Sequence, residues 1–218
     1  LRTPLTTMQG YLETLLLKKA ELSAEEQRQY LETALHHSQH LARLVEELFE
    51  LARLDSCESV VYSEPFSIGE LVQDVTQTFL LRAEQKSIQL DASLNPETPL
   101  IYGDIAMMQR VLENLLENGL RHTPDGGRIN VSVDVDSGHV FVQISDTGCG
   151  IPEKDVPRIF ERFYQQDINR TDRNSSGSGL GLAIVKRILE LHGSAIKVRS
   201  EINKGTTFSF QMDAKPTV

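Results

Sequence analysis

The first 54 residues carry two apolar stripes at helical spacing, and no other feature limits the possible folds as strongly. The first stripe advances in steps of four and three residues and consists of Leu1, Leu5, Met8, Leu12 and Leu15. This spacing puts the five side chains on one face of an α-helix. After a polar break, Ser23 and Glu26 have the capping-box pattern that starts a helix. We therefore expect a second helix over residues 24–54, roughly 46 Å long at 1.5 Å per residue.

The second expected helix has an apolar stripe of its own. It consists of Tyr30, Ala34, Leu41, Leu44, Leu48 and Leu51, with His37 in the same register. Two helices joined by a short loop form an antiparallel hairpin, which cannot by itself bury a full stripe on each helix. Pairing of two hairpins into a four-helix bundle would bury both stripes. Packing of the hairpin against the rest of its own chain is the alternative that periodicity leaves open.

The pattern changes after residue 55. Residues 56–65 contain Ser, Cys, Glu and Pro without a helical stripe, and we interpret them as a linker between domains 1–55 and 66–214. The second domain is expected to form helices over 67–83, from Asp104 to about 120, over 152–163 and over 180–192. Strands are expected over 87–94, 128–134, 139–145, 196–199 and 206–212. The fold class is therefore α+β, a helical hairpin followed by an α/β sandwich with one layer of helices on one sheet.

Composition excludes several classes of function. The 22 Lys and Arg against 31 Asp and Glu give a net charge of −9, which disfavours non-specific nucleic-acid binding. The two cysteines, Cys57 and Cys149, imply no disulfide framework and a reducing compartment. No apolar run approaches the roughly 20 residues of a membrane-spanning helix, so no membrane contact is expected of this stretch. The chain starts with Leu, so an anchor further upstream stays open.

Four clusters in the second domain carry chemistry, and the first lies on the helix that ends near residue 120. Asn114, Asn118 and Arg121 are four and three residues apart and share one helical face. An Asn amide oxygen suits Mg²⁺, which takes few protein ligands and completes its shell with phosphates and water. Arg121 could neutralise phosphate charge nearby. A solvated polar helix face is the alternative reading of this cluster alone.

The second cluster is Asp146-Thr147-Gly148-Cys149-Gly150 at the end of an expected strand. A carboxylate can accept a hydrogen bond from an exocyclic amine such as that of adenine. The two glycines would let the backbone approach a flat ligand closely. A plain Asp-x-Gly turn is the alternative.

The third and fourth clusters flank a polar segment, 165–178, that is expected to be a mobile loop. The aromatic cluster Phe160-Glu161-Arg162-Phe163-Tyr164 precedes this segment and could anchor it or pack in the core. The glycine cluster Gly177-Ser178-Gly179-Leu180-Gly181 precedes a helix, whose first amides suit phosphate. This cluster fits neither the Rossmann fingerprint nor the P-loop.

In this order and spacing, the four clusters closely resemble the N, G1, F and G2 boxes of bacterial sensor histidine kinases. The start of the chain, Leu1-Arg2-Thr3-Pro4-Leu5, is similar to the tail of that family's phosphoacceptor motif, and residues 43–54 resemble the end of its second dimerisation helix. The resemblance covers nearly the whole chain. It implies a helical-hairpin dimerisation domain, a four-helix bundle in the homodimer, followed by an ATP-binding sandwich of the Bergerat type.

The resemblance also implies roles for individual residues. Asn118 would coordinate Mg²⁺ and Asn114 would lie beside the triphosphate of ATP. Arg121 and His122 would lie near phosphate or ribose, and Asp146 would bind the adenine amine. The remaining implied contacts shape the pocket wall or a lid over the phosphates: Gly148, Gly150, Phe160, Phe163, Gly177, Gly179, Leu180 and Gly181. On electrostatic grounds we add Arg170 and Arg173 as γ-phosphate contacts, with solvated loop arginines as the alternative.

The family motif places the phosphoacceptor histidine, and the acidic residue after it, before Leu1. The reaction implied is transfer of the γ-phosphoryl group of ATP to that histidine and then to an Asp of a response-regulator receiver domain. Thr3 would lie one turn beyond the histidine and could position water for dephosphorylation of the regulator. The chain would be a cytoplasmic domain, and inner-membrane anchorage of the full-length protein stays open. The histidines within the chain are disfavoured as acceptors: His36, His37, His40, His139 and His192.

Two other functions stay open. One is a nucleotide-binding module that acts by docking without catalysis. The other is a gyrase-like or chaperone-like ATPase of the same superfamily, which uses a catalytic Glu on the Asn-box helix. Glu113 and Glu117 keep that option available, whereas the Leu-Arg-Thr-Pro-Leu start argues against it.

Overall fold

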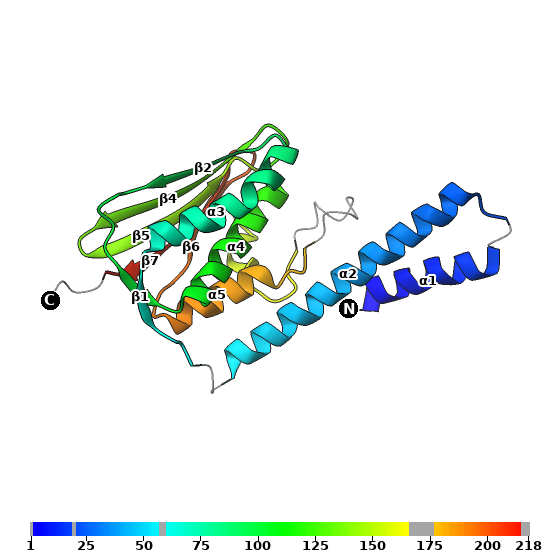
Figure 1. Ribbon diagram of the computed structural model, residues 1–218, viewed down its shortest axis with the longest axis horizontal. Helices are drawn as coiled ribbons and strands as arrows, with labels where there is room; N and C mark the ends of the chain where they lie inside the picture. The colour runs from blue at the N-terminus through cyan, green and yellow to red at the C-terminus, as the bar shows by residue number, and fades with distance from the viewer. Residues whose placement is uncertain (1, 19–20, 57–59, 166–176, 215–218) are drawn as a thin grey trace. The chain divides into compact units, whose positions relative to one another are not determined.

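The computed structural model describes residues 2–18, 21–56, 60–165 and 177–214, which belong to two compact units, Leu1–Ala52 and Arg53–Val218. The first unit consists of helix α1 (Arg2–Lys18) and most of helix α2 (Ala24–Asp55) (Figure 1). The last turn of α2 belongs to the second unit. The two expected helices are therefore confirmed. Among helices in the described ranges, none combines the length and the apolar composition that crossing a membrane requires.

The first unit is an antiparallel helical hairpin (Figure 1). Helix α2 starts at a complete capping box, because Ser23 N donates to Glu26 Oε2 (2.8 Å) and Glu26 N donates to Ser23 Oγ (3.2 Å). Tyr11 of α1 packs against Tyr30 of α2 with ring centroids 5.3 Å apart. The hairpin leaves a second apolar row of α2 in solvent, which consists of Leu31, Leu35, Val45 and Phe49.

The second unit is built on a five-stranded mixed sheet of order β2-β4-β5-β7-β6. The strands are β2 (Gln89–Leu94), β4 (Arg128–Asp136), β5 (His139–Asp146), β6 (Lys197–Glu201) and β7 (Gly205–Asp213). Strands β2 and β4 pair in parallel, and all other neighbours pair antiparallel. A separate two-stranded ribbon joins β1 (Glu64–Phe66) to β3 (Ile101–Gly103).

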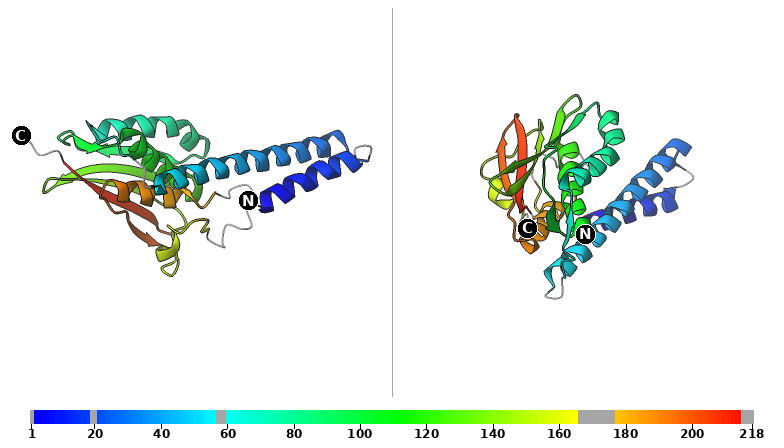
Figure 2. Two further views of the ribbon diagram at one scale, coloured as in Figure 1. Left: turned by 90° about the horizontal axis from the view of Figure 1, so that it is seen from below. Right: turned by 60° about the vertical axis from the view of Figure 1, so that its left-hand side comes forward.

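Three helices cover one face of the five-stranded sheet: α3 (Ile68–Gln85), α4 (Ile105–His122) and α5 (Gly181–Leu191) (Figures 1 and 2). The alternation along β5 explains this layering, since Val140, Val142 and Ile144 are buried while Gln143 on the other face is exposed. The same alternation in β4 and β7 completes the core. The expected α+β class, a helical region followed by an α/β sheet domain, is confirmed.

Two expectations about local structure were wrong or incomplete. The helix expected over 152–163 is only the 3₁₀ turn η1 (Val156–Arg158), because Pro152 and Pro157 cannot donate to the helical hydrogen-bond ladder. The short strands β1 and β3 were not anticipated, and β1 includes Glu64 and Pro65 from the expected linker. The central part of the loop expected over 165–178 lies outside the described residues.

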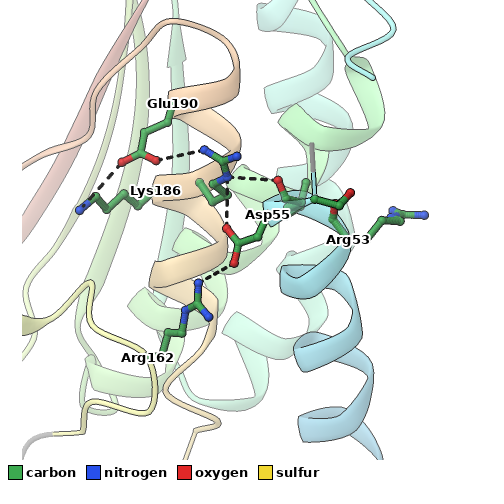
Figure 3. A network of polar contacts seen from close by, with 8 residues as sticks. Arg53, Asp55, Arg162, Lys186 and Glu190 are labelled. Carbon is green, nitrogen blue, oxygen red and sulfur yellow. Dashed lines mark hydrogen bonds and ion pairs between the residues drawn. The ribbon is translucent and has the colours of Figure 1, made fainter. Parts of the chain in front are cut away.

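A network of charged side chains ties the last turn of α2 to the rest of the second unit (Figure 3). The Asp55 carboxylate accepts from Arg162 through one oxygen and pairs with Arg187 Nε at 3.3 Å through the other. The Arg187 Nε also donates to the Leu54 carbonyl at 3.1 Å, and its guanidinium lies 3.6 Å from Glu190. Asp55 thus connects α5 with the segment that follows η1.

Candidate functional site

Helix α4 presents a half-buried polar face that carries the first cluster. Asn114, Asn118 and Arg121 lie on this face, whereas Leu115 and Leu116 on the opposite face are buried in the core. The start of α4 is fixed by Asp104, whose Oδ1 accepts from Met107 N at 3.1 Å. The amphipathic pattern of the helix therefore determines which way the polar cluster faces.

The glycine cluster lies directly against this face of α4. A Cβ atom on Gly181 would lie 2.8 Å from Asn114 Oδ1, and one on Gly177 would overlap the Arg121 guanidinium. The Asn114 amide nitrogen donates to the Arg110 carbonyl at 2.8 Å, which leaves its oxygen toward Gly181. Two clusters more than 50 residues apart in the chain are thus in contact, and the glycines of the second cluster are needed for the close approach.

The start of α5 leaves backbone donors for an anion. Within the described residues no side chain caps this helix, whose first residue is Gly181. The first amides of a helix lack internal partners and carry a partial positive charge. The Leu180 side chain is completely buried, so only its backbone could reach a ligand. Its N–H donates to Ser178 Oγ at 3.0 Å, which fixes the turn before the helix.

Asp146 lies at the end of β5 with one carboxylate oxygen committed to the backbone. Its Oδ1 accepts from Gly148 N at 2.8 Å and from Thr206 N at 3.3 Å. Its Oδ2 has no hydrogen-bond partner among the described residues. Burial raises the pKa of Asp146, and the two backbone hydrogen bonds oppose that shift. Asp146 is therefore anchored through one oxygen while the other can accept a hydrogen bond from a ligand.

The loop after Asp146 is fastened to the end of α4. The Cys149 N–H donates to the His122 carbonyl at 3.3 Å, and a Cβ atom on Gly148 would lie 2.5 Å from that same carbonyl oxygen. Gly150 adopts a positive φ of +71°, and a Cβ atom there would overlap the Glu201 carbonyl. Only glycine allows both approaches, so the Asp146 carboxylate is held at a fixed place relative to α4.

His122 is uncharged at neutral pH. Burial, together with the nearby positive charges of Arg121 and Lys86, lowers the pKa of His122 to about 4, and burial is the largest cause. A neutral imidazole can donate or accept one hydrogen bond but brings no positive charge to a phosphate. Of the two basic residues at the end of α4, Arg121 and His122, only Arg121 can supply a positive charge.

The aromatic cluster divides into a partly buried residue and an exposed residue. Phe160 packs edge-on against Phe208 of β7 with ring centroids 6.5 Å apart. Phe163 is half exposed and has a positive φ of +62°, and its N–H donates to the Gly179 carbonyl at 2.8 Å. The Gln165 side chain donates to the Gly177 carbonyl. The aromatic and glycine clusters are thus joined to each other. Arg170 and Arg173 lie outside the described residues, as does the side chain of Thr3 in α1.

Residues that the sequence did not single out complete the site. Thr206 lies opposite Asp146 in the β5–β7 register, and its hydroxyl lies 2.9 Å from Ser200 Oγ. Ser200 Oγ also accepts from Ile151 N at 2.8 Å. Strand pairing alone brings these hydroxyls to Asp146, and no motif in the sequence marks them.

The donor set suits a hard divalent cation that is bound mainly through phosphates. Asn118 is half-buried, and its side chain makes no hydrogen bond within the described residues. In the same ranges, no group of three or more His, Cys, Asp or Glu could hold a metal ion. A single amide oxygen beside a polyphosphate fits the coordination of Mg²⁺.

Comparisons with known proteins show the family of the chain. Residues 103–216 match the family of histidine kinase-, DNA gyrase B- and HSP90-like ATPases, and residues 1–57 match the His Kinase A phospho-acceptor domain. The chain is 37% identical over 223 residues to drug sensory protein A of Synechocystis, covering 97% of this chain and 33% of that protein. It is 34% identical over 217 residues to sensor histidine kinase WalK of Bacillus subtilis, covering 99% and 35%. The chain thus spans about a third of the length of these relatives.

Solved structures show the same fold. The full-length ShkA structure in complex with AMPPNP has a TM-score of 0.74 at 29% identity, covering 98% of this chain and 44% of that one. The histidine kinase ThkA in complex with the response regulator TrrA has a TM-score of 0.79 at 24% identity, covering 99% and 59%. With both family models matched in order along one chain, and the Asn and glycine clusters in contact, this chain belongs to the sensor histidine kinase family.

Proposed function

We propose that this chain is a kinase core that binds Mg-ATP and transfers the γ-phosphoryl group to a histidine. The observation that carries the proposal is the contact between Asn114 and Arg121 of α4 and the glycines before α5. It creates one site with a positive guanidinium and helix amides at one end. The uncommitted Asp146 oxygen lies at the end of β5, and the loop that follows it is fastened to the same helix.

Each end of the site would bind a different part of the nucleotide. Asp146 Oδ2 would accept from the adenine amine, while Oδ1 stays bound to the backbone. Arg121 and the first amides of α5 would bind the phosphates, and Asn118 would hold Mg²⁺. When bound, Mg²⁺ would neutralise charge that develops on the phosphate oxygens.

The acceptor we propose is the histidine that the family motif places before Leu1. Its unprotonated ring nitrogen would attack the γ-phosphorus, so that an N–P bond forms and the bond to the bridging oxygen of ADP breaks. The proton on the other ring nitrogen would pass to the acidic residue next to it. The phosphoryl group would then move to an Asp carboxylate of a receiver domain. ThkA with bound TrrA supports a partner of that kind.

The first unit would act as a homodimer. The exposed row of α2, Leu31, Leu35, Val45 and Phe49, is a second apolar seam beside the one that faces α1. Association of two hairpins would bury this seam as a four-helix bundle. Thr3 would then lie on the first helix near the acceptor and could position water for dephosphorylation of the regulator.

The alternative of a gyrase-like ATPase is less well supported. Both carboxylate oxygens of Glu117 face guanidinium groups, of Arg82 at 2.7 Å and of Arg121 at 3.6 Å. Glu113 accepts from Gln109 at 2.8 Å and lies 3.9 Å from Arg110. Both carboxylates are engaged by neighbouring side chains, which disfavours the water-activating role that this mechanism needs.

The decisive experiment uses the chain extended upstream to include the acceptor histidine. With γ-labelled ATP and Mg²⁺, a kinase acquires an acid-labile, alkali-stable label on histidine. A docking module binds ATP without label, and a gyrase-like ATPase releases phosphate. Either of those two results would overturn the proposal.

Two substitutions assign the ends of the site. Asp146→Asn is expected to weaken ATP binding about tenfold or more, the size of one charge-assisted hydrogen bond. Asp134→Asn, on the exposed face of β4, is the matched control.

Asn118→Ala is expected to abolish labelling, and full activity of that variant would contradict the Mg²⁺ assignment.

A further inference from the structure

Glu117 stands between two arginines on the polar side of α4, and the nucleotide-binding proposal gives it no role. Its Oε2 lies 2.7 Å from Arg82 NH1 on α3, and its Oε1 lies 3.6 Å from Arg121 NH2 one turn further along α4. The side chains of Glu117 and Arg121 are 33% and 27% exposed, so the pair is shielded from water more than a surface ion pair. Each oxygen of one carboxylate therefore faces a different guanidinium.

Arg121 needs such a partner to keep a defined position. Its guanidinium occupies the space that a side chain at position 177 would fill, so it bridges α4 and the glycine cluster. An arginine side chain has several rotatable bonds and loses substantial entropy when it is fixed. The carboxylate of Glu117 restricts the guanidinium to the side of α4 that faces Gly177.

Arg82 keeps the carboxylate from opposing an anionic ligand. A lone Glu117 beside bound phosphates would repel them, but two guanidinium groups leave the cluster with a net positive charge. The hydrogen bond to Glu117 also raises the pKa of Arg82. Arg82 is itself held in place, because its guanidinium lies over the Phe79 ring, 5.2 Å from the centroid. Arg82 on α3 thus holds Glu117, and Glu117 in turn holds Arg121.

We propose that Glu117 is a positioning residue that holds Arg121 for the phosphates of the nucleotide, with Arg82 as its anchor on α3. This inference rests on the proposed ATP site. It assigns to Glu117 an effect that is transmitted through Arg121 and grows with the charge of the phosphate chain. It predicts a much smaller effect on the adenine end, where Asp146 lies at the end of β5.

The test is calorimetric titration of the chain with Mg-ATP and with Mg-ADP. Glu117→Gln is expected to weaken ATP binding about tenfold and ADP binding less, since one charge-assisted contact to the phosphates is lost. In a double-mutant cycle, Glu117→Gln is expected to add no further loss to the Arg121→Gln variant. Arg82→Met, at a more exposed position, should weaken ATP binding by a smaller factor. Glu113→Gln is the matched control, because Glu113 has the same exposure one turn earlier and faces Arg110.

The outcomes separate this inference from the function on which it rests. If the unaltered chain binds neither nucleotide, the proposed ATP site fails. If the unaltered chain binds ATP but the affinity of Glu117→Gln for ATP is equal or higher, Glu117 acts only as a negative charge and the inference is overturned. Additive losses from Glu117→Gln and Arg121→Gln would overturn it as well. Thermal melting of each variant identifies any loss of affinity that comes from unfolding. If Glu117→Gln is unfolded, the affinity of the folded Arg82→Met variant tests the inference instead.

Discussion

At the scale of single residues, burial controls protonation at the end of α4. The pKa of His122 is lowered to about 4 from 6.5 because the ring is buried, with Arg121 and Lys86 adding to the shift. The uncharged ring lets Arg121 remain the only positive group of that turn, which suits a site for phosphates. The same shift makes stability depend on pH.

The sign of that dependence follows from proton uptake. Between pH 6.5 and about 4 the unfolded chain binds a proton at His122 that the folded chain does not. The contribution of His122 to the free energy of unfolding is therefore fully present above pH 6.5. It falls, by on the order of 3 kcal/mol, as the pH approaches the folded pKa. Urea denaturation over this range should show a smaller decline for His122→Gln than for the unaltered chain. Carboxylates, including Asp146, titrate in both proteins and cancel in the difference.

His139 supplies the control for this measurement. It lies at the start of β5 and is 41% exposed beside Asp213. His139→Gln replaces an exposed histidine by the same residue and is the reference variant against which the decline in His122→Gln is compared. Equal slopes for His122→Gln and the unaltered chain would contradict the buried, uncharged assignment.

At the scale of elements, the close approach of α4 and α5 depends on a glycine, which has no side chain. Ala is normally favoured over Gly in a helix by about 0.8–1 kcal/mol. At position 181, however, the added methyl would lie 2.8 Å from Asn114 Oδ1. Gly181→Ala is expected to keep or raise the melting temperature while it weakens Mg-ATP binding about tenfold.

The first turn of α3 offers the matched control for Gly181. A Cβ atom on Gly69 would meet only Ser67 Oγ, at 3.8 Å. Gly69→Ala should therefore stabilise the helix without a change in nucleotide affinity. Unchanged affinity in Gly181→Ala would show that the contact between Asn114 and the glycine cluster does not matter for binding.

The opposite end of α5 is joined to α4 by one imidazole. His192 Nε2 accepts from Asp104 N at 3.0 Å, and its Nδ1 lies 2.8 Å from the Ile188 carbonyl, so the proton is assigned to Nδ1. His192→Ala leaves a half-buried N–H without this partner and should lower the free energy of unfolding by about 1–3 kcal/mol. Chemical denaturation measures the loss. A stability equal to that of the unaltered chain would mean that water replaces the ring at no cost.

At the scale of the whole molecule, the exposed apolar row of α2 predicts self-association. Leu31, Leu35 and Phe49 are 55%, 58% and 72% exposed in the single chain. Burial of one leucine side chain contributes about 1.5–3 kcal/mol, and a two-fold interface counts each substitution twice. Leu35→Glu is therefore expected to convert a dimer into monomers in sedimentation equilibrium.

A leucine outside the hairpin controls for the loss of an exposed apolar side chain. Leu81 on α3 is 65% exposed. Leu81→Glu should leave the dimer intact. Dimers that persist in Leu35→Glu, or dissociate equally in both variants, would contradict the seam on α2.

Much of the fold could be predicted because local patterns repeat many times. The stripes of α1 and α2 and the alternation in β4 and β5 each contain several residues that agree on one period. The helix expected over 152–163 failed because an apolar stripe there competes with two prolines, which remove backbone donors. Strands β1 and β3 were missed because three residues show no period at all.

The candidate site was found only in part for a related reason. Asn118, Arg121, Asp146 and the glycines belong to compact motifs that remain visible in the sequence. Thr206 and Arg82 have no motif, since they reach Asp146 and Glu117 by strand pairing and by helix packing. Their partners lie 60 and 35 residues away along the chain, where no local pattern connects them.

The amino-acid sequence by itself determined the helical hairpin, the alternating strands and the chemical types gathered in the four clusters, because these depend on side-chain periodicity and composition over short stretches. Only the tertiary structure decided that Asn114 meets Gly181, that Asp146 keeps one oxygen uncommitted, and that Glu117 faces two arginines. Those relations depend on the crossing of α4 and α5 and on the β5–β7 register. Both are set by the packing of a shared apolar core, which sums contacts over the whole second unit.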